Sequence, residues 1–344
     1  MPEFTALASL DEIRRLVGDL PGPDLAARDA AAERQQHLTK PAGALGRLET
    51  LALWLAEWQN RHPPRIDHPR VAVFAGNHGV AGRGVSAYPP AVTAQMVRNF
   101  IDGGAAINQL CRVADADLRV YELTLERPTA DFVEGPAMSE GECAHAIAYG
   151  MMAVEPGIDL LALGEMGIGN TTSAAALAHA LFGGTAADWV GPGTGVDAAG
   201  ILRKTETVTA AVLRHRAVAG NGDGLVTLAS LGGRELAAIA GAVLAARLAR
   251  VPVVLDGYAA TAAAAALLPL AEGILDHCIV AHVSAEPGHR RLLAAMGREP
   301  LFDLGLRLGE ASGAALAIPL LKAAVACHAG MATFAEAGVS GPAE

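Results

Sequence analysis

The feature that most constrains the fold is an alternation of short apolar segments with longer helical ones, which begins near residue 71. Strands that alternate with helices are joined by right-handed crossovers, and the result is a parallel sheet covered by helices. The sequence therefore predicts an α/β fold with a mostly parallel sheet. The expected strands are Val71–Ala75, Leu118–Leu123, Asp159–Leu163, Trp189–Val190, Val251–Leu255 and Ile279–His282.

The first 60 residues show helical patterns instead. Ser9 and Glu12 have the spacing of a capping box, in which each side chain accepts a hydrogen bond from the other residue's backbone. A second helix is expected from about Asp24 to Leu38, and a third from Leu48 to Trp58, where apolar residues recur at helical spacing. We therefore expect a helical N-terminal segment, joined to the sheet by a proline-containing linker.

Composition excludes several classes of protein. The chain has 344 residues, of which 52% are hydrophobic, so a disordered chain would leave too much apolar surface in water. The net charge of −10 and the lack of a basic stripe argue against nucleic acid as a partner. A phosphorylated small molecule is compatible with this charge, because the amides of glycine loops bind phosphate without basic residues.

The sequence also carries expectations about location. The N-terminus lacks the basic start and apolar core of a signal peptide. The longest uncharged run, Met166–Ala187, contains too many polar residues and glycines for a membrane span. The four cysteines form no C-x-x-C pair and are expected to be reduced thiols, and no metal-ligand spacing is visible. We therefore expect a cytoplasmic protein without a metal site.

Candidate ligand residues follow the expected strands, because ligands of parallel sheets lie beyond the carboxyl ends of the strands. The loop Gly164–Thr172 is rich in glycine and opens a helix, whose N-terminus suits a phosphate. Glu165 in this loop would repel phosphate and is expected to hold sugar hydroxyls. The loop is not a Walker A motif, since no Gly-Lys-Ser/Thr ends it, and the alternative is a tight turn between a strand and a helix.

Other strand ends carry similar signals. The glycine loop Gly191–Gly195 precedes a helix with Lys204, which is either a counter-charge for phosphate or an exposed helix residue. His78 follows the first strand, as a ligand residue or as a loop histidine bonded to backbone. Asp256–Tyr258 and Ser284–His289 follow the last two expected strands at the same edge of the sheet.

Glu310 stands within the glycine-containing segment Gly305–Gly313, ahead of an apolar helix expected over Ala314–Val325. An acid at this point can simply stabilise the helix N-terminus by its charge, and the segment alone favours that interpretation. The alternative is a functional carboxylate that serves the neighbouring strand-edge loops.

With these segments assembled, the chain resembles the nicotinate-nucleotide:dimethylbenzimidazole phosphoribosyltransferase family, which makes α-ribazole phosphate for the lower ligand of cobalamin. Several ordered motifs carry the resemblance, from about residue 40 to the last helix, and together they are far more specific than one glycine loop. The motifs are Lys40–Glu49, Phe74–Val80, Gly103–Asn108, Gly164–Thr172, Gly191–Asp197, Val253–Ala260, His282–His289 and Gly305–Ala317.

The resemblance implies a Rossmann-like large catalytic domain over residues 63–313 and a small helical domain built from both chain ends, residues 1–62 and 314–344. It also implies a homodimer with active sites near the subunit interface. The implied substrates are nicotinate mononucleotide and 5,6-dimethylbenzimidazole or a related base, and the implied reaction needs no cofactor.

The resemblance further assigns roles to single residues. Glu310 lies where the family has its base near the benzimidazole nitrogen, and Glu165 matches the acid of the ribose-binding loop. Lys204 would bind the nucleotide phosphate, whereas Tyr88 and Gln95 fall in the stretch that lines the base pocket. The residues expected to bind substrate are Tyr88, Gln95, Glu165, Met166, Gly167, Gly193, Lys204 and Ser284.

The implied reaction suits a carboxylate at Glu310. Nicotinate leaves the pyridinium nucleotide as a neutral ring, so no general acid is needed. A benzimidazole that attacks through one nitrogen must lose the proton on the other, and a positioned carboxylate accepts that proton and favours positive charge on the ribose. Attack opposite the nicotinate inverts the anomeric carbon and gives α-ribazole 5'-phosphate. Two alternatives are a nucleotide N-glycoside hydrolase and a non-catalytic nucleotide- or base-binding regulator.

Overall fold

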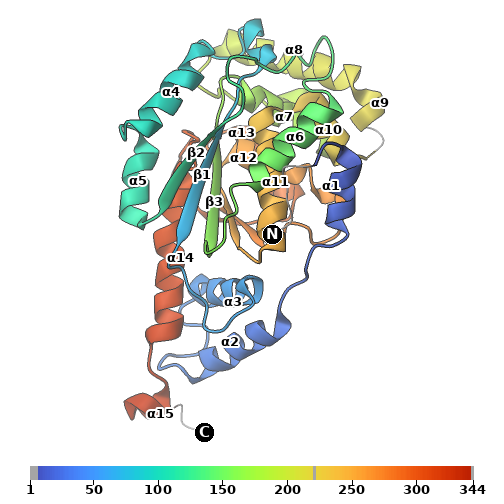
Figure 1. Cartoon of the computed structure of the whole chain (residues 1–344). Helices are drawn as coiled ribbons and strands as arrows, with labels where there is room; N and C mark the ends of the chain where they lie inside the picture. The colour runs from blue at the N-terminus through green and yellow to red at the C-terminus, as the bar shows by residue number, and fades with distance from the viewer. Residues whose placement is uncertain (1–6, 220–221, 342–344) are drawn as a thin grey trace.

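The computed structural model describes residues 7–219 and 222–341, and a sheet covered by helices lies at its centre (Figure 1). The sheet has six strands in the order β2-β1-β3-β4-β5-β6. Every neighbouring pair is parallel, which confirms the predicted α/β fold. The strands are β1 (Pro69–Ala75), β2 (Asp117–Glu122), β3 (Leu160–Met166), β4 (Val253–Leu255), β5 (Cys278–His282) and β6 (Pro300–Phe302).

The strand order reverses between β1 and β3. The chain moves outward from β1 to β2, then returns across β1 to β3 and continues away from it. Ligands of open parallel sheets bind at such a reversal, beyond the carboxyl ends of the two strands. The loops after β1 and β3 therefore hold the favoured position for a site.

Two differences from the expected strands have physical reasons. Trp189–Val190 is not a strand, because Trp189 follows a 3₁₀ helix, η3 (Ala186–Asp188), and its buried indole donates to the carbonyl of Gly183 at 2.8 Å. The strand β6 was not expected. It has three residues and begins with a proline, which an edge strand tolerates because one side of it needs no ladder bonds.

Helices cover both faces of the sheet, and alternate residues of each strand enter two different cores. Ala72 and Phe74 of β1 pack into one core, and Val71 and Val73 into the other. The first core is formed with α6 (Glu140–Met151), α7 (Asn170–Phe182), α8 (Ala198–Arg214), α10 (Gly224–Leu231), α11 (Arg234–Leu248), α12 (Tyr258–Ala265) and α13 (Pro287–Ala295). The second is formed with α3 (Arg47–Gln59), α4 (Ala91–Ile101), α5 (Ala106–Ala114) and α14 (Ser312–Gly330).

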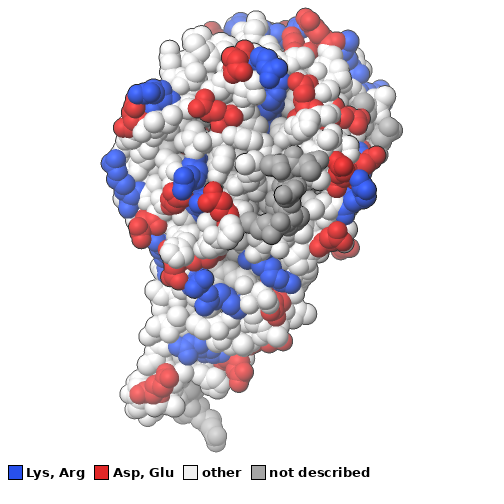
Figure 2. Space-filling model, in the orientation of Figure 1, with Lys and Arg blue, Asp and Glu red and all other residues white. Residues whose placement is uncertain are grey.

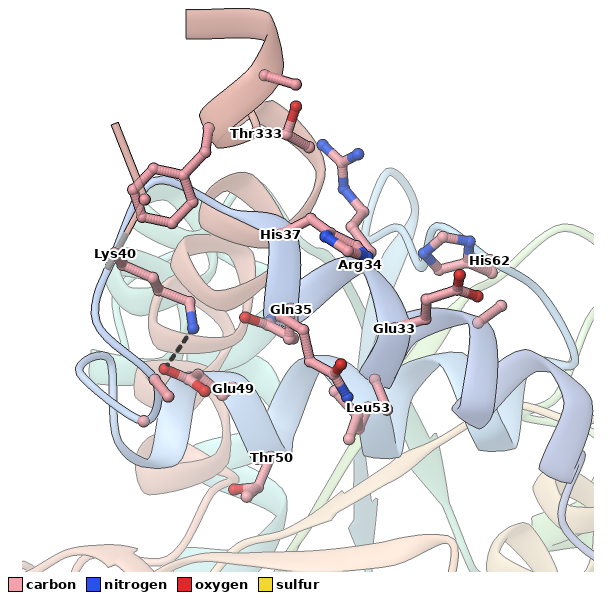
Figure 3. Close-up of a pocket in the computed structure, with 18 residues that line it drawn as sticks. Glu33, Arg34, Gln35, His37, Lys40, Glu49, Thr50, Leu53, His62 and Thr333 are labelled. Atoms are coloured by element: carbon pink, nitrogen blue, oxygen red, sulfur yellow. Dashed lines mark ion pairs between the residues drawn. The ribbon is translucent and has the colours of Figure 1, made fainter. Parts of the chain in front are cut away.

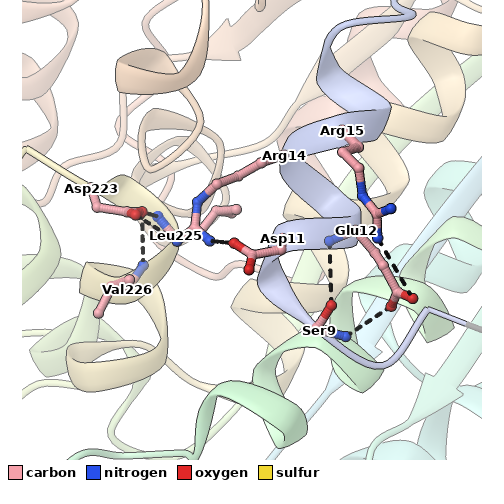
Figure 4. Close-up of polar contacts among 8 residues, drawn as sticks. All are labelled: Ser9, Asp11, Glu12, Arg14, Arg15, Asp223, Leu225 and Val226. Carbon is pink, nitrogen blue, oxygen red and sulfur yellow. Dashed lines mark hydrogen bonds and ion pairs between the residues drawn. The ribbon is translucent and has the colours of Figure 1, made fainter.

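The helical N-terminal segment is confirmed, with α1 (Leu10–Val17), α2 (Leu25–His37) and α3. The capping box at Ser9 is present: its hydroxyl accepts from the N–H of Glu12 at 3.3 Å, and the Glu12 carboxylate accepts from the N–H of Ser9 at 3.0 Å (Figure 4). Arg14 of α1 contacts Asp223, the N-cap of α10, at 2.5 Å. The helix α1 is thereby fixed against the α/β core.

The helices α2 and α3 form an extension below the sheet in Figure 1, together with the end of α14 and the short α15 (Phe334–Ala337). Arg34 of α2 donates to the carbonyl of His328 at 2.8 Å, and Leu38 forms an antiparallel bridge with Thr333. The helix α2 and the residues around the end of α14, far apart in the sequence, therefore pack on each other.

The helix α14 connects this extension with the sheet. It is long and apolar enough to span a membrane by length and composition. Its first half, however, packs in the second core, where Ala314, Ala315 and Ile318 are fully buried. We therefore regard α14 as a core helix of the α/β fold.

Candidate active site

The carboxyl edge of the sheet brings together segments that are far apart in the sequence. The N–H of Gly76, after β1, donates to the carbonyl of Met166 at the end of β3, at 3.0 Å. The N–H of Asp256, after β4, donates to the carbonyl of Leu163 at 3.0 Å, and Glu310 donates to Glu165. The segments with most of the candidate residues thus meet at one edge.

Glu310 is held in an unusual backbone conformation. Gly309, Glu310 and Ala311 are all left-handed, with φ of 79°, 61° and 61°. Non-glycine residues adopt this region at a cost of the order of 1 kcal/mol or more, and such strain is concentrated at functional sites. A Cβ atom on Gly164 would lie only 2.1 Å from the backbone nitrogen of Ala311, so a glycine in β3 is required for this close approach.

The Glu310 carboxyl group is buried, with 4% of the residue exposed, and its Oε2 atom has no hydrogen-bond partner in the described structure. Burial, together with the negative charge of Asp256, raises the pKa of Glu310 to about 7. The carboxylate is therefore balanced between its two protonation states near neutral pH, as a general base requires.

Glu310 does not cap the helix that follows it. Asp256 has this role, because its Oδ1 accepts from the N–H of Ala314 in the first turn of α14 at 2.9 Å. Glu310 therefore does not provide the hydrogen bond that caps the first turn of α14, although it precedes the N-cap residue Ala311. Asp256 is itself buried, and its Oδ2 has no partner among the described residues.

Glu165 lies beside Glu310 at the end of β3. Its carbonyl accepts from the N–H of Glu310 at 3.0 Å, and its side chain accepts from the amide of Asn170 in the first turn of α7. Burial is the main cause that raises the pKa of Glu165 to about 8, followed by the charges of Glu235 and Asp256. The buried carboxyl groups of Glu165, Asp256 and Glu310 therefore share one site, and a positive charge placed there would favour the ionised forms of Glu165 and Glu310.

Lys204 of α8 lies on the other side of the first turn of α7. The side chain is fully buried, so the expectation of an exposed helix lysine is wrong. Its Nζ donates to the hydroxyl of Thr171 at 3.1 Å and to the carbonyl of Gly191 at 2.9 Å. An ammonium group has three donors, so one more is available for an anion. Burial lowers the pKa of Lys204 to about 8.

The second glycine loop is tied to the segment after β5. The N–H of Gly193 donates to Oε1 of the buried Glu286 at 2.7 Å, and the Gly193 carbonyl accepts from Arg307 at 3.0 Å. Ser284 is buried nearby, and its hydroxyl accepts from the N–H of Glu286 at 3.2 Å. The amide of Gly193 is thus already bonded to a carboxylate within the chain.

The residues expected near the base are less enclosed. Tyr88 is 54% exposed and Gln95 on α4 is also exposed, whereas Met166 is half-buried at the end of β3. The loop with Tyr88 is joined to the second glycine loop, because the hydroxyl of Thr194 accepts from the N–H of Ala87 at 3.0 Å. In the described structure, Tyr88 and Gln95 therefore lie at the surface of the single chain.

His78 lies against the loop at residues 164–172, and its imidazole bonds side chains, not backbone. Its Nε2 is 2.5 Å from Oε1 of Glu235, and its Nδ1 is 3.0 Å from the hydroxyl of Ser173. Glu235 was not expected from the sequence. The signal available was an acid at the start of an otherwise apolar helix, after Gly232–Gly233, and that pattern usually marks a helix-end charge.

A cavity of about 1030 Å³ lies elsewhere, in the helical extension (Figure 3). Its lining includes the ion pair between Lys40 and Glu49, at 2.8 Å, and residues of α2 and α15. Gln59 at the end of α3 donates to the carbonyl of Asp159, just before β3, so this extension adjoins the amino ends of the strands. The cavity is therefore at the opposite end of the sheet from the candidate site.

The surface agrees with a small-molecule site. On the face seen in Figure 2, acidic and basic side chains are interspersed, and no basic stripe crosses that face. Lys204 is buried and therefore contributes little to the field at the surface.

Known proteins of one enzyme family are similar to this chain over nearly its whole length. A model of the phosphoribosyltransferase family DBI_PRT matches residues 20–339. The nicotinate-nucleotide–dimethylbenzimidazole phosphoribosyltransferase of Ruegeria pomeroyi is 59% identical over 335 residues, which cover 97% of this chain and 98% of the relative. That of Brucella anthropi is 56% identical over 331 residues, with coverage of 96% and 97%.

Two crystal structures from Thermus thermophilus have the same fold. The structure of its nicotinate-nucleotide–dimethylbenzimidazole phosphoribosyltransferase superposes with a TM-score of 0.85 at 43% identity and covers 93% of this chain and 100% of that chain. A structure of CobT from the same organism gives a TM-score of 0.85 at 45% identity, with coverage of 92% and 99%.

Proposed function

The chain belongs to the nicotinate-nucleotide–dimethylbenzimidazole phosphoribosyltransferase family, and from this premise we propose how its residues carry out the transfer. The donor is nicotinate mononucleotide and the acceptor is 5,6-dimethylbenzimidazole. The bond between the nicotinate nitrogen and the ribose breaks, and a bond from one benzimidazole nitrogen to the same carbon forms on the opposite face. The products are nicotinate, α-ribazole 5'-phosphate and one proton.

The observation that carries the proposal is the buried carboxyl group of Glu310, with one oxygen that has no partner in the described structure and a pKa raised to about 7. The acceptor must lose the proton of its second ring nitrogen as the first attacks. Glu310 takes that proton, because its raised pKa makes it a stronger base than an exposed carboxylate and leaves it ionised just above neutral pH. Nicotinate leaves as a neutral ring and needs no proton.

The charges of the site match those along the nucleotide. Lys204 contacts Thr171 at the N-terminus of α7, and the ammonium group and the helix N-terminus together suit the phosphate. Glu165 is bonded to Asn170 in the same turn and lies next to Glu310. We place the ribose between these two sides, with its hydroxyls on Glu165 and its developing positive charge facing the acidic group.

We place Met166, Gly167 and Ser284 along the same nucleotide, with Gly193 near its phosphate end. Because the N–H of Gly193 is bonded to Glu286, the loop contributes to the phosphate site through its position beside Lys204, whose Nζ would lie 3.0 Å from a Cβ atom on Gly193. The nearby Arg307 holds the carbonyl side of this loop.

We propose that the protein acts as a cytoplasmic homodimer in which the second copy completes the base pocket. Tyr88 and Gln95, the residues assigned to that pocket, are exposed in the single chain. Leu308 is 55% exposed and follows Arg307, which contacts the loop joined to the Tyr88 segment. Light scattering with size-exclusion chromatography tests this point: a dimer supports it, and a monomer at assay concentration contradicts it.

Release of nicotinate separates the transferase from the two other functions. The protein is incubated with nicotinate mononucleotide, with and without dimethylbenzimidazole, and free nicotinate is measured by chromatography. Release that requires the base supports the transferase. Equal release without the base indicates a hydrolase, and absence of release under both conditions indicates a binding protein.

A further inference from the structure

Ser173, His78 and Glu235 form a hydrogen-bonded group behind the nucleotide loop, residues 164–172, and this group has no part in the reaction described above. It joins three elements: Ser173 is in the first turns of α7, His78 follows β1, and Glu235 is in the first turn of α11. The two distances are 3.0 Å from Ser173 Oγ to His78 Nδ1 and 2.5 Å from His78 Nε2 to Glu235 Oε1.

The hydrogen-bonded group of Ser173, His78 and Glu235 is not a nucleophilic triad. The side chains of His78 and Glu235 and the residue Ser173 are all fully buried, so no substrate reaches the Ser173 hydroxyl. The order of contacts also differs from that of a serine hydrolase, in which Nε2 of the histidine faces the serine and Nδ1 faces the acid. The group must act on its surroundings instead.

Glycines pack tightly around the pair. A Cβ atom on Gly233 would lie 2.3 Å from Cε1 of His78, and one on Gly76 would lie 2.4 Å from Oε2 of Glu235. A Cβ atom on Gly167, in the nucleotide loop itself, would lie 3.3 Å from Nε2 of His78. The imidazole is thus enclosed and in direct contact with the loop it supports.

The contacts of this hydrogen-bonded group reach both sides of the proposed nucleotide site. Ser173 stands one turn after Asn170 and therefore shares a face of α7 with it. Asn170 holds the carboxyl group of Glu165, and Thr171 holds Lys204. A displacement of this turn would move the acidic and the basic partner of the nucleotide together.

We propose that Ser173, His78 and Glu235 are positioning residues. The His78–Ser173 bond fixes the first turns of α7 behind the nucleotide. The Glu235 carboxyl group lies against Gly76, whose N–H is bonded to Met166 beside Glu165, and acts on Glu165 by its charge. The proposal rests on the proposed function for the assignment of this turn to the nucleotide. Its two parts have separate tests, because one bond can be removed without the charge and the charge without the bond.

The hydrogen bond is tested by Ser173→Ala, with hydrogen exchange measured on the free protein. Amide exchange in residues 168–176 should rise about five- to tenfold, the effect of one lost buried hydrogen bond, while exchange in β3 stays unchanged. In separate variants with Ser173 present, His78→Asn, which keeps a polar atom near the position of Nδ1, should largely keep the protection of the unsubstituted protein, whereas His78→Gln should lose it. An unchanged rate, or an equal rise throughout the sheet, would overturn this part.

The charge is tested by Glu235→Gln, which keeps an acceptor for His78 but removes the charge. The charged groups that face Glu165 are Glu235 on α11, Asp256 after β4 and Glu310 before α14. Loss of one negative neighbour lowers the pKa of Glu165, so it ionises at lower pH.

The readout is the affinity for nicotinate mononucleotide against pH, measured by calorimetry without dimethylbenzimidazole, so that the Glu310 proton transfer does not contribute. In Glu235→Gln, the acid limb of this affinity profile should move to lower pH by at least about 0.5 unit, a shift that neighbouring charges commonly cause. Glu142→Gln is the matched control, because Glu142 contacts the start of α11 through Arg234 but lies at the surface.

If the acid limb of the affinity profile stays in place in Glu235→Gln, the proposed effect of the Glu235 charge on Glu165 is wrong. Absence of nucleotide binding by the unsubstituted protein would instead contradict the proposed function, and the exchange experiment would still decide the role of the Ser173–His78 bond.

Discussion

The backbone N–H of Glu310 donates a hydrogen bond of 3.0 Å to the carbonyl oxygen of Glu165, and this bond sets two buried carboxyl groups side by side. One belongs to the end of β3 and the other to a strained segment before α14. We assign the first to the ribose and the second to the attacking base. Their proximity explains how one site can favour a ribosyl cation and also accept a proton.

Gly164→Ala should displace Glu310 without touching any charge. The added Cβ would lie 2.1 Å from the backbone nitrogen of Ala311, and backbone cannot move aside as a flexible side chain does. We expect a loss of about 1–3 kcal/mol in unfolding free energy, the usual range for overpacking, together with a fall in kcat. Urea denaturation and nicotinate release measure the two effects.

Gly141→Ala is the control for this substitution. Gly141 lies in α6, and a Cβ atom there would meet nothing within 4 Å. Alanine favours the helix, so stability should stay equal or rise by up to about 1 kcal/mol. If Gly164→Ala behaves like this control, the close approach of β3 to the Glu310 segment is wrong.

Asp256→Asn should lower the pKa of Glu310. The charge of Asp256 is, after burial, the named cause of the raised value, and asparagine keeps an oxygen for the N–H of Ala314. The acid limb of kcat, measured with both substrates saturating, should therefore move to lower pH by at least about 0.5 unit. The exposed Asp303→Asn should leave the limb in place, and a shift of the same size there would contradict the assignment.

Lys204→Met should weaken nucleotide binding more than it slows turnover. The buried ammonium provides a charged donor for the phosphate, and such hydrogen bonds contribute about 1.5–3 kcal/mol, or about 10- to 150-fold in KM for nicotinate mononucleotide. With native Lys204, affinity should decline above pH 8 as the amine loses its proton. Lys322→Met, on α14, is the control, and a KM change below threefold in Lys204→Met would count against the phosphate role.

Glu165→Gln should change the pH dependence of stability. The pKa of Glu165 is raised from 4.5 to about 8 on folding, so the folded state holds its proton more tightly. The stability from that proton is fully present below pH 4.5 and is lost as pH rises through 8. The variant should therefore gain stability relative to the unsubstituted protein between pH 5 and pH 9, by about 1–3 kcal/mol. The measurement is urea denaturation of both proteins at pH 5 and pH 9. If the difference in unfolding free energy between variant and unsubstituted protein is the same at both pH values, the account is wrong.

The sequence could predict the sheet because buried parallel strands have a strong local pattern. Five of the six expected strands are present, and the glycine-rich loops follow them. Trp189 was misplaced because a short apolar segment has the same composition in a strand and in a buried turn. The edge strand β6 was missed because its three residues have no pattern of their own.

Partners across the fold could not be predicted. Lys204 is buried only because α8 packs over Thr171 and Gly191, which no local pattern records. Likewise, Asp256 follows the distant strand β4 and accepts a hydrogen bond from the first turn of α14, a contact that the sequence around Glu310 does not indicate. The roles of the substrate-binding residues, the domain boundaries and the homodimer stay predictions from the family resemblance.

The central claim is that Glu310 accepts the proton of the attacking base, and Glu310→Gln tests it most directly. Nicotinate release is measured at pH 8 with nicotinate mononucleotide and dimethylbenzimidazole both saturating, beside the exposed Glu299→Gln as control. We predict at least a ~10²-fold lower kcat for Glu310→Gln, the usual scale for a positioned base, with unchanged circular dichroism and nucleotide affinity. Turnover within threefold of the control would contradict the claim.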